Sequence, residues 1–128
     1  MNKDITKLYL NLFLKQYSDE MSGADYEREL KEILTKEGWL VFRVAGSFQC
    51  DLIALKLTDH MIIECKSVKG NTFYTSSDKD QFNILNNIAK LGFNVYYYIR
   101  WKGTKQWTKY QLPLEPYPVF KKGITNEK

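Results

Sequence analysis

Apolar residues recur every three to four positions along residues 4–17 and again along residues 23–37, and this spacing predicts two amphipathic helices. The second helix has defined end signals, because Ser22 and Asp25 match a capping box and Gly38 suits a left-handed C-terminal turn. The first helix is apolar around most of its circumference. We therefore expect it to pack against the domain on one side and against a second subunit on the other.

A different pattern follows, in which short runs of β-branched and aromatic residues alternate with turn-forming residues. These runs predict strands over 39–44, 51–57, 61–66 and 93–99, with a helix over 78–91 before the last strand. A tight turn at 58–60 makes the second and third strands antiparallel, whereas a helix between two strands implies a parallel pair. The predicted fold class is therefore α/β, with an αβββαβ core and a mixed central sheet flanked by helices.

The 128 residues are enough for one compact domain. We expect an N-terminal helical extension over 1–22, a main domain over 23–112 and a C-terminal arm over 113–128. All three prolines lie at the start of this arm, which makes it extended. The arm either packs along the domain or binds a partner.

Composition excludes several classes of protein. With 44% hydrophobic and 27% charged residues, and no apolar run of about 18 residues, the chain fits a globular protein without membrane association. The N-terminal sequence lacks the pattern of a secretory signal, so we expect a cytoplasmic location and two reduced cysteines. A single histidine excludes Cys/His zinc sites and two-histidine metal sites, so any metal must be bound by carboxylates.

Positive charge is concentrated near the C-terminus. The first 99 residues contain 12 basic and 13 acidic residues, whereas the remainder contains seven basic and two acidic residues. Between residues 100 and 110, cations alternate with aromatic residues, which suits a surface that follows nucleic-acid phosphates. Arg100, Lys102 and Lys105 are therefore candidate DNA-binding residues. The alternative is a solvated final strand with a basic tail.

The strongest chemical signal lies in the predicted hairpin of the second and third strands. Asp51 begins one strand, while Glu64 and Lys66 end the other on a common face, so two carboxylates and an amine converge. Asp51, Glu64 and the backbone carbonyl of Cys65 would supply oxygen ligands for Mg²⁺, with Mn²⁺ as a substitute. Lys66 would hold or deprotonate a water for phosphodiester hydrolysis. The alternative is a structural ion pair between Glu64 and Lys66.

Asp51, a gap of twelve residues and then Glu64-Cys65-Lys66 resemble the PD-(D/E)xK nuclease superfamily, which implies a restriction-endonuclease-like fold. A wider set of motifs is similar to the archaeal-type Holliday-junction resolvases. These motifs are Gly23-Ala24-Asp25-Tyr26-Glu27-Arg28-Glu29-Leu30, Arg43 and Ala45-Gly46-Ser47. Family members often carry basic residues between this serine and the aspartate, whereas the present chain has Phe48-Gln49-Cys50.

The resemblance implies further site residues. Glu27 would assist the metal or its water, and Ser47 would lie beside the active site. Arg28 and Arg43 would contact phosphates near the scissile bond. From the residues alone, the alternatives are a solvated first turn of the helix and a strand arginine that faces water.

Two more residues are candidates for DNA contacts. Gln81 lies early in the last helix, where a glutamine in this superfamily often faces the site, and the alternative is an ordinary exposed helix residue. Lys69 is the basic residue that the loop after Lys66 offers.

These inferences lead to a Mg²⁺-dependent endonuclease that cuts four-way DNA junctions. A homodimer follows from the substrate, because symmetric incision of two strands needs two identical sites related by a two-fold axis. One alternative is a nuclease of the same superfamily that acts on duplex or flapped DNA in repair or restriction. Another is a catalytically silent DNA-binding module.

Overall fold

The structure of the chain is a computed structural model, which describes residues 22–45 and 50–125. The predicted helix over 4–17 and the candidate Ser47 lie outside the described residues. No helix within the described segments is long and apolar enough to cross a membrane.

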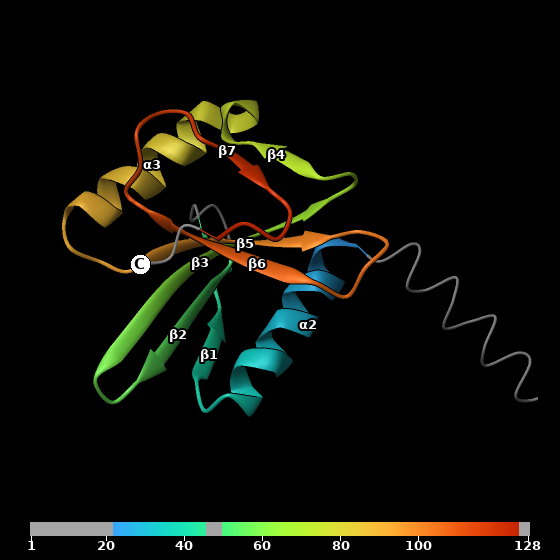
Figure 1. Cartoon of the computed structure of the whole chain (residues 1–128). Helices are drawn as coiled ribbons and strands as arrows, with labels where there is room; N and C mark the ends of the chain where they lie inside the picture. The colour runs from blue at the N-terminus through green and yellow to red at the C-terminus, as the bar shows by residue number, and fades with distance from the viewer. Residues whose placement is uncertain (1–21, 46–49, 126–128) are drawn as a thin grey trace, which may run out of the picture.

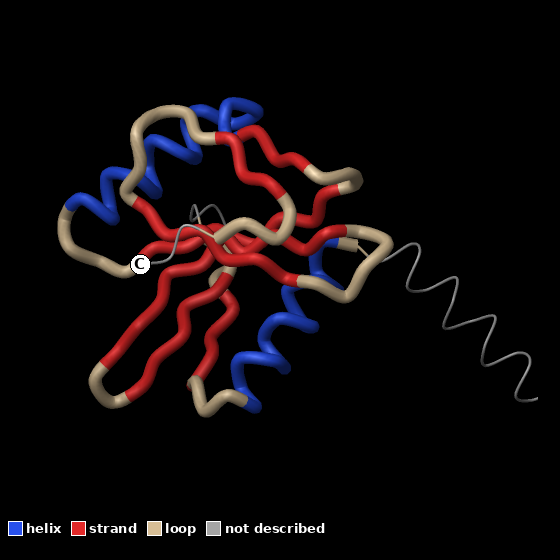
Figure 2. The backbone as a smooth tube through the Cα atoms, in the orientation of Figure 1, coloured by secondary structure: helices blue, strands red, loops and turns tan. Residues whose placement is uncertain are grey.

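A five-stranded mixed sheet forms the centre of the molecule, with α2 on one face and α3 on the other (Figure 1 and Figure 2). In chain order the elements are α2 (Gly23–Lys36), β1 (Leu40–Arg43), β2 (Leu52–Lys56), β3 (Asp59–Val68), β4 (Thr72–Tyr74), the 3₁₀ turn η1 (Thr75–Asp78), α3 (Lys79–Lys90), β5 (Val95–Trp101), β6 (Trp107–Leu112) and β7 (Val119–Lys121). The strands of the main sheet are ordered β1-β2-β3-β5-β6. Within the main sheet, the succession of α2, β1 to β3, α3 and β5 confirms the predicted αβββαβ core, and β4 belongs to a second sheet.

Local contacts define both ends of α2. The Asp25 carboxylate accepts hydrogen bonds from the Ser22 backbone N–H and from Ser22 Oγ, each at 3.0 Å. After the helix, Gly38 adopts a φ of 94°, a conformation that costs little only without a Cβ atom. This turn lets the Trp39 N–H donate to the Leu34 carbonyl at 3.0 Å. The end signals in the sequence therefore act as the sequence analysis expected.

β3 is the central strand of the sheet. It pairs antiparallel with β2, where Leu52 opposes Ile63, and parallel with β5, where Glu64 opposes Tyr97. Both directions agree with the prediction. A strand with two partners is flanked on both sides of its backbone, and Glu64 within β3 is only 4% exposed.

Some predicted boundaries are wrong by one or two residues. The turn between β2 and β3 is shorter than the predicted 58–60, because Asp59 already belongs to β3. The strand predicted over 93–99 runs instead from Val95 to Trp101. Its parallel ladder with β3 continues to Val68, so the length of the neighbouring strand decides where β5 ends.

Each face of the sheet has its own apolar core. The core under α2 consists of Leu30, Leu34, Val41, Leu52, Ala54, Met61, Ile63, Tyr96 and Tyr98. The core under α3 consists of Cys50, Phe82, Leu85, Ala89, Val95, Tyr97, Ile99, Trp101, Tyr110, Leu112 and Phe120. Side chains of β5 alternate between the two cores, as strand geometry requires. Both cysteines are free thiols.

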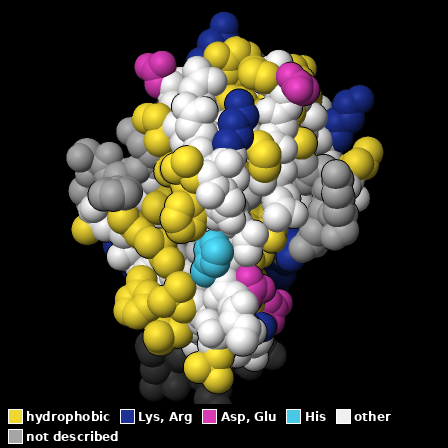
Figure 3. All heavy atoms as spheres, turned by 90° about the vertical axis from the view of Figure 1, so that its left-hand side faces the viewer, with side chains coloured by type: hydrophobic (Ala, Val, Ile, Leu, Met, Phe, Trp, Pro, Cys, Tyr) yellow, Lys and Arg dark blue, Asp and Glu magenta, His cyan; other side chains and the backbone are white. Residues whose placement is uncertain are grey.

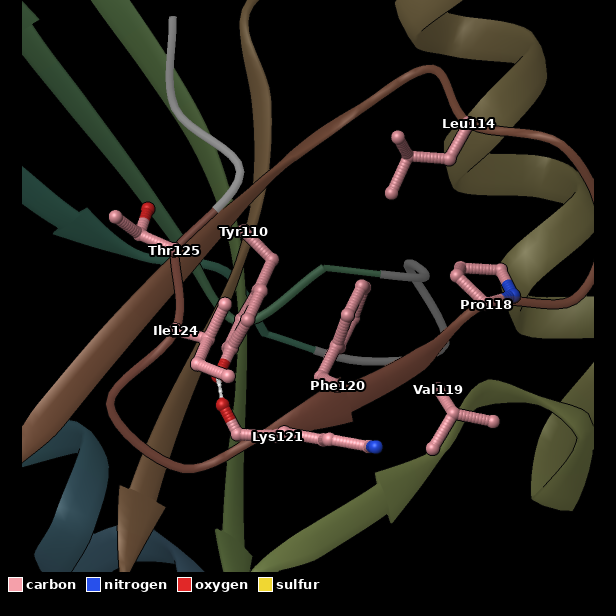
Figure 4. A pocket seen from close by; sticks show the side chains of 8 residues that line it. All are labelled: Tyr110, Leu114, Pro118, Val119, Phe120, Lys121, Ile124 and Thr125. Carbon is pink, nitrogen blue, oxygen red and sulfur yellow. Dashed lines mark hydrogen bonds between the residues drawn. The ribbon is translucent and has the colours of Figure 1, made fainter.

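Residues 113–125 of the C-terminal arm pack along the domain (Figure 1). β7 pairs antiparallel with β4 in a small second sheet that the sequence analysis did not predict. Phe120 of β7 stacks on Tyr110 with 4.1 Å between ring centroids. Asn86 of α3 holds the segment between β6 and β7 through two hydrogen bonds to Leu114. Its side-chain amide donates to the Leu114 carbonyl at 3.0 Å and accepts from the Leu114 N–H at 2.9 Å. Figure 4 shows the apolar pocket of about 290 Å³ that results, lined by Tyr110, Leu114, Pro118, Val119, Phe120, Lys121, Ile124 and Thr125.

Candidate active site

Asp51 lies immediately before β2 and is held against β3 by two hydrogen bonds. Its backbone N–H donates to the Ile63 carbonyl at 2.8 Å. Its Oδ2 accepts from the Cys65 N–H at 2.8 Å. The residue between these two partners is Glu64, so the fold places the two carboxylates side by side.

Glu64 is nearly buried, with only 4% of the residue exposed. Its Oε2 contacts two donors from different elements. Lys66 Nζ lies 3.1 Å away, on the same face of β3. Gln81 Nε2 donates to the same oxygen at 2.8 Å from the first turn of α3. The ion pair considered as the alternative role of Lys66 is therefore present, and Gln81 lies at the carboxylates.

The carboxylates of this site are difficult to ionise together. Burial and then the negative charge of Asp51 raise the pKa of Glu64 to about 8, although Lys66 partly offsets them. Burial and Asp51 also raise the pKa of Glu27, which reaches the site from α2, while Arg43 lowers it. The nearby basic side chains therefore do not fully balance the negative charge of Glu27, Asp51 and Glu64. A bound cation would reduce the repulsion among these carboxylates.

Two exposed arginines, Arg28 and Arg43, lie near Glu27. Glu27 Oε2 accepts a hydrogen bond from Arg43 Nε at 3.1 Å. Arg28 makes a 3.1 Å ion pair with Asp25. The side chains of Arg28 and Arg43 are 62% and 63% exposed, and both residues line a small pocket of about 120 Å³ together with Glu27. Their guanidinium groups are thus accessible to a phosphate in solution.

The donors around Asp51 and Glu64 fit a small, hard divalent cation. Residues 22–45 and 50–125 hold no group of three or more His, Cys, Asp or Glu side chains that could by itself hold a metal ion. Mg²⁺ does not need one, because it retains several waters and binds through one or two carboxylates. The N–H and C=O of a strand residue point toward the same neighbouring strand. Since the Cys65 N–H points to Asp51, its carbonyl faces the same side and can add a third oxygen.

The other basic candidates lie elsewhere. One pocket is lined by four of them, Lys69, Arg100, Lys102 and Lys105, together with Tyr26, Gly103 and Thr104. Arg100 differs from its neighbours because it is only 7% exposed and belongs to β5. The basic end of the chain is therefore not a uniformly solvated surface.

Glu29 is a functional candidate that the sequence analysis missed. Its Oε1 accepts hydrogen bonds from Arg100 Nε and Trp107 Nε1, both at 2.8 Å. These partners lie 71 and 78 residues further along the chain, so no local pattern could reveal them. The one local signal is the position of Glu29 next to the buried Leu30 on α2.

Comparisons with known proteins identify relatives of this chain. The model of the archaeal Holliday junction resolvase (Hjc) family matches residues 18–114. The crossover junction endodeoxyribonuclease Hjc of Methanocaldococcus jannaschii is 45% identical over 56 residues, which span 44% of this chain and only 42% of that protein. The structure of Archaeoglobus fulgidus Hjc, a Holliday junction resolvase from an archaeal hyperthermophile, has a TM-score of 0.63 and 25% identity, and the match covers 78% of this chain and 84% of that one. Because the family match extends over most of the chain, this protein belongs to the archaeal Holliday junction resolvase family.

Proposed function

We propose that this protein is a structure-specific endonuclease that resolves four-way DNA junctions by paired phosphodiester hydrolysis. The observation that carries the proposal is the convergence of Asp51, Glu64 and Lys66 where β2 and β3 meet, in a member of the resolvase family. Both relatives named above are junction enzymes. The catalytic domain is proposed to span 23–112, and Phe120 of the C-terminal arm completes its core.

A divalent cation is part of this proposal, as family membership implies. Asp51, Glu64 and the Cys65 carbonyl would hold it, and Glu27 would orient a water beside Asp51. Mg²⁺ is the proposed ion, with Mn²⁺ as a substitute, because all donors are oxygens. Bound there, the cation would stabilise negative charge that develops on the scissile phosphate.

Lys66 is proposed to act on the attacking water. Its Nζ is fixed 3.1 Å from Glu64 Oε2 and lies at the carboxylates rather than in bulk solvent. Lys66 would hold or deprotonate the water while the water oxygen bonds to phosphorus. The bond from phosphorus to the leaving oxygen then breaks, and the leaving oxygen takes a proton from solvent.

Several residues are proposed to position the DNA. Arg28 and Arg43 present exposed guanidinium groups beside Glu27 and would bind phosphates next to the scissile bond. Gln81 would orient Glu64 through the 2.8 Å hydrogen bond to Oε2. Ser47, only four residues before Asp51, is proposed to lie beside the site on the resemblance alone.

A second subunit is proposed because paired incision of a four-way junction needs two identical sites. Its location is supported by the apolar sheet face, defined as Leu40, Phe42, Leu55 and Phe93 around His60. Strand pairing places Leu40 beside Leu55 and Leu55 beside His60, and Phe93 packs edge-on against His60 at 5.9 Å. Leu40 is 60% exposed and both phenylalanines are 49% exposed. Figure 3 shows hydrophobic side chains gathered beside His60, and such contiguous patches usually mark interfaces.

The proposed function is tested by incubating the protein and Mg²⁺ with labelled four-way junction, duplex and flapped DNA of equal length. We expect paired, symmetric nicks in the junction, and none when a chelator removes the cation. Asp51→Ala should abolish cutting while junction binding stays within several-fold, because phosphate contacts dominate affinity. Glu32→Ala removes an exposed acid on α2 and should cut at the wild-type rate.

Each alternative gives a different outcome in the same experiment. Equal cutting of duplex or flapped DNA would replace junction resolution by a broader repair or restriction activity. Binding to the junction without cutting any substrate would indicate a catalytically silent module. Wild-type cutting by Asp51→Ala would place the active site elsewhere.

A further inference from the structure

A basic pocket lies where the C-terminal ends of β3 and β5 meet the start of α2. Lys69 follows β3, Lys102 and Lys105 belong to the turn between β5 and β6, and Tyr26 closes the pocket from α2. The Lys102 N–H donates to the Val68 carbonyl at 2.8 Å, which joins the two strand ends. The pocket has a volume of about 680 Å³, and no acidic residue is among those that line it in the described part of the chain.

Arg100 provides a rigid cation within this pocket. Its Nε is fixed by Glu29 at 2.8 Å, and its Nη1 donates to the Trp101 carbonyl at 3.2 Å. The guanidinium carbon lies 5.6 Å from the centre of the Tyr26 ring. A residue that is 93% buried and still lines a pocket offers a pre-oriented charge, whereas exposed lysines must be ordered on binding.

Glu29 does not neutralise the pocket. Burial alone would raise the pKa of Glu29, but hydrogen bonds from Arg100 and Trp107 and the charges of Arg100 and Lys105 lower it overall. Glu29 therefore stays ionised and holds Arg100 in place. Its single negative charge leaves a surplus of three positive charges among Lys69, Arg100, Lys102 and Lys105.

The pocket lies apart from the carboxylates of the candidate active site. Arg100 pairs with Ser67, which is three residues beyond Glu64 on β3. At about 3.3 Å per residue, the two backbone positions are about 10 Å apart along the strand, and side chains three residues apart point to opposite faces of the sheet. Glu64 accordingly contacts Gln81 of α3, whereas Arg100 contacts Glu29 of α2, so the pocket can bind a phosphate other than the scissile one.

We propose that this pocket binds a backbone phosphate of the DNA other than the scissile phosphate, independently of base sequence. The inference rests on the proposed DNA substrate. It assigns to Lys102, Lys105 and Lys69 a positioning role that is separate from catalysis at Glu64. Phosphate contacts of this kind fix the register of a protein on DNA without reading its bases.

The test compares Lys102→Ala/Lys105→Ala with Lys36→Ala/Lys90→Ala, which removes the same charge from exposed lysines on α2 and α3. Binding to a fluorescent four-way junction is measured by anisotropy in chelator, so that no cutting occurs, over a series of salt concentrations. For the pocket variant we expect a loss of about tenfold or more in affinity, and a log–log salt slope about two units shallower. Single-turnover cutting at saturating protein should stay within about twofold of the wild type.

The outcomes separate this inference from the proposed function. If the wild-type protein cuts junctions normally but the pocket variant and the control have equal salt slopes, the pocket does not bind a phosphate, and the proposed function is unaffected. A wild-type protein that binds junctions but cuts nothing would overturn the proposed nuclease function. The difference in salt slope between the pocket variant and the control would still test whether the pocket binds a phosphate. A large loss in saturated cutting rate would show that the lysines act in catalysis, and the separate positioning role would fall.

Discussion

Glu64 occupies a position where an ionised carboxylate is costly. It is 4% exposed, and burial and the charge of Asp51 raise its pKa to about 8. In the metal-free protein Glu64 therefore binds a proton more readily than an ordinary carboxylate does, and a divalent cation competes with that proton. The residue proposed to bind the cation is thus one that destabilises the fold when the cation is absent.

Glu64→Gln should stabilise the metal-free protein in a pH-dependent way. In the unfolded chain Glu64 ionises near its ordinary pKa of 4.5, but in the folded chain it ionises near 8. Between these values the unfolded state binds fewer protons, so the free energy of unfolding of the wild type falls as pH rises, by up to about 1.4 kcal/mol per unit. Glutamine does not titrate, so the variant should match the wild type near pH 5 and exceed it increasingly toward pH 8.

Urea unfolding in chelator at pH 5, 6, 7 and 8 measures this difference. Glu115→Gln, at an exposed position in the arm, is the control and should show no such trend. A difference between Glu64→Gln and the wild type that is constant with pH would contradict the buried, proton-bound state of Glu64.

Lys66→Ala separates the two roles available to this side chain. If Lys66 acts on the attacking water, the single-turnover cutting rate should fall by about a hundredfold or more, with junction affinity changed only a few-fold. Lys56→Ala, at an exposed position on β2, should leave the rate unchanged. A loss of tenfold or less would reduce Lys66 to the structural partner of Glu64.

At the scale of elements, α2 links the two proposed DNA-binding regions. Glu27 contacts Arg43 and lies near Asp51, whereas Glu29 binds Arg100 and Trp107 at the basic pocket. Two residues on the same short helix therefore serve different sites. A shift of α2 would therefore change the contacts of Glu27 near Asp51 and those of Glu29 at the basic pocket.

The arm is expected to contribute to stability through Phe120. This side chain is 4% exposed and packs against Tyr110, Tyr97 and Phe73. Phe120→Ala should lower the free energy of unfolding by about 3–5 kcal/mol, because it leaves a cavity in the core. Val119 on the same strand is 45% exposed, so Val119→Ala should lower the free energy of unfolding by less than about 1 kcal/mol. Urea midpoints measure both, and equal small losses would mean that the arm adds little to the core.

At the scale of the whole molecule, Phe42→Glu should disrupt the proposed dimer, because it places a charge on the apolar sheet face. Sedimentation at micromolar concentration should show a monomer, and junctions should then be nicked singly rather than in pairs. Ile124→Glu, which is exposed in the C-terminal segment, is the control and should remain dimeric. A dimer that survives Phe42→Glu would move the interface to another surface.

Much of the fold was predictable because its signals are local. The capping residues of α2, the alternation along β2 and β3 and the strand–helix–strand order each depend on residues close together in the chain. The same local geometry predicted that Asp51, Glu64 and Lys66 would meet, since a short turn leaves little choice of register. Their catalytic roles stay predictions.

The tertiary structure alone decided the contacts that join distant segments. The pairing of β4 with β7, the ion pair of Glu29 with Arg100 and the assembly of four cations into one pocket all join residues that no local pattern relates. The pKa of Glu64 belongs to the same group, because it depends on burial and on the approach of Asp51. Periodicity and end signals report only what neighbours in the chain prefer, whereas burial and charge proximity are properties of the packed molecule.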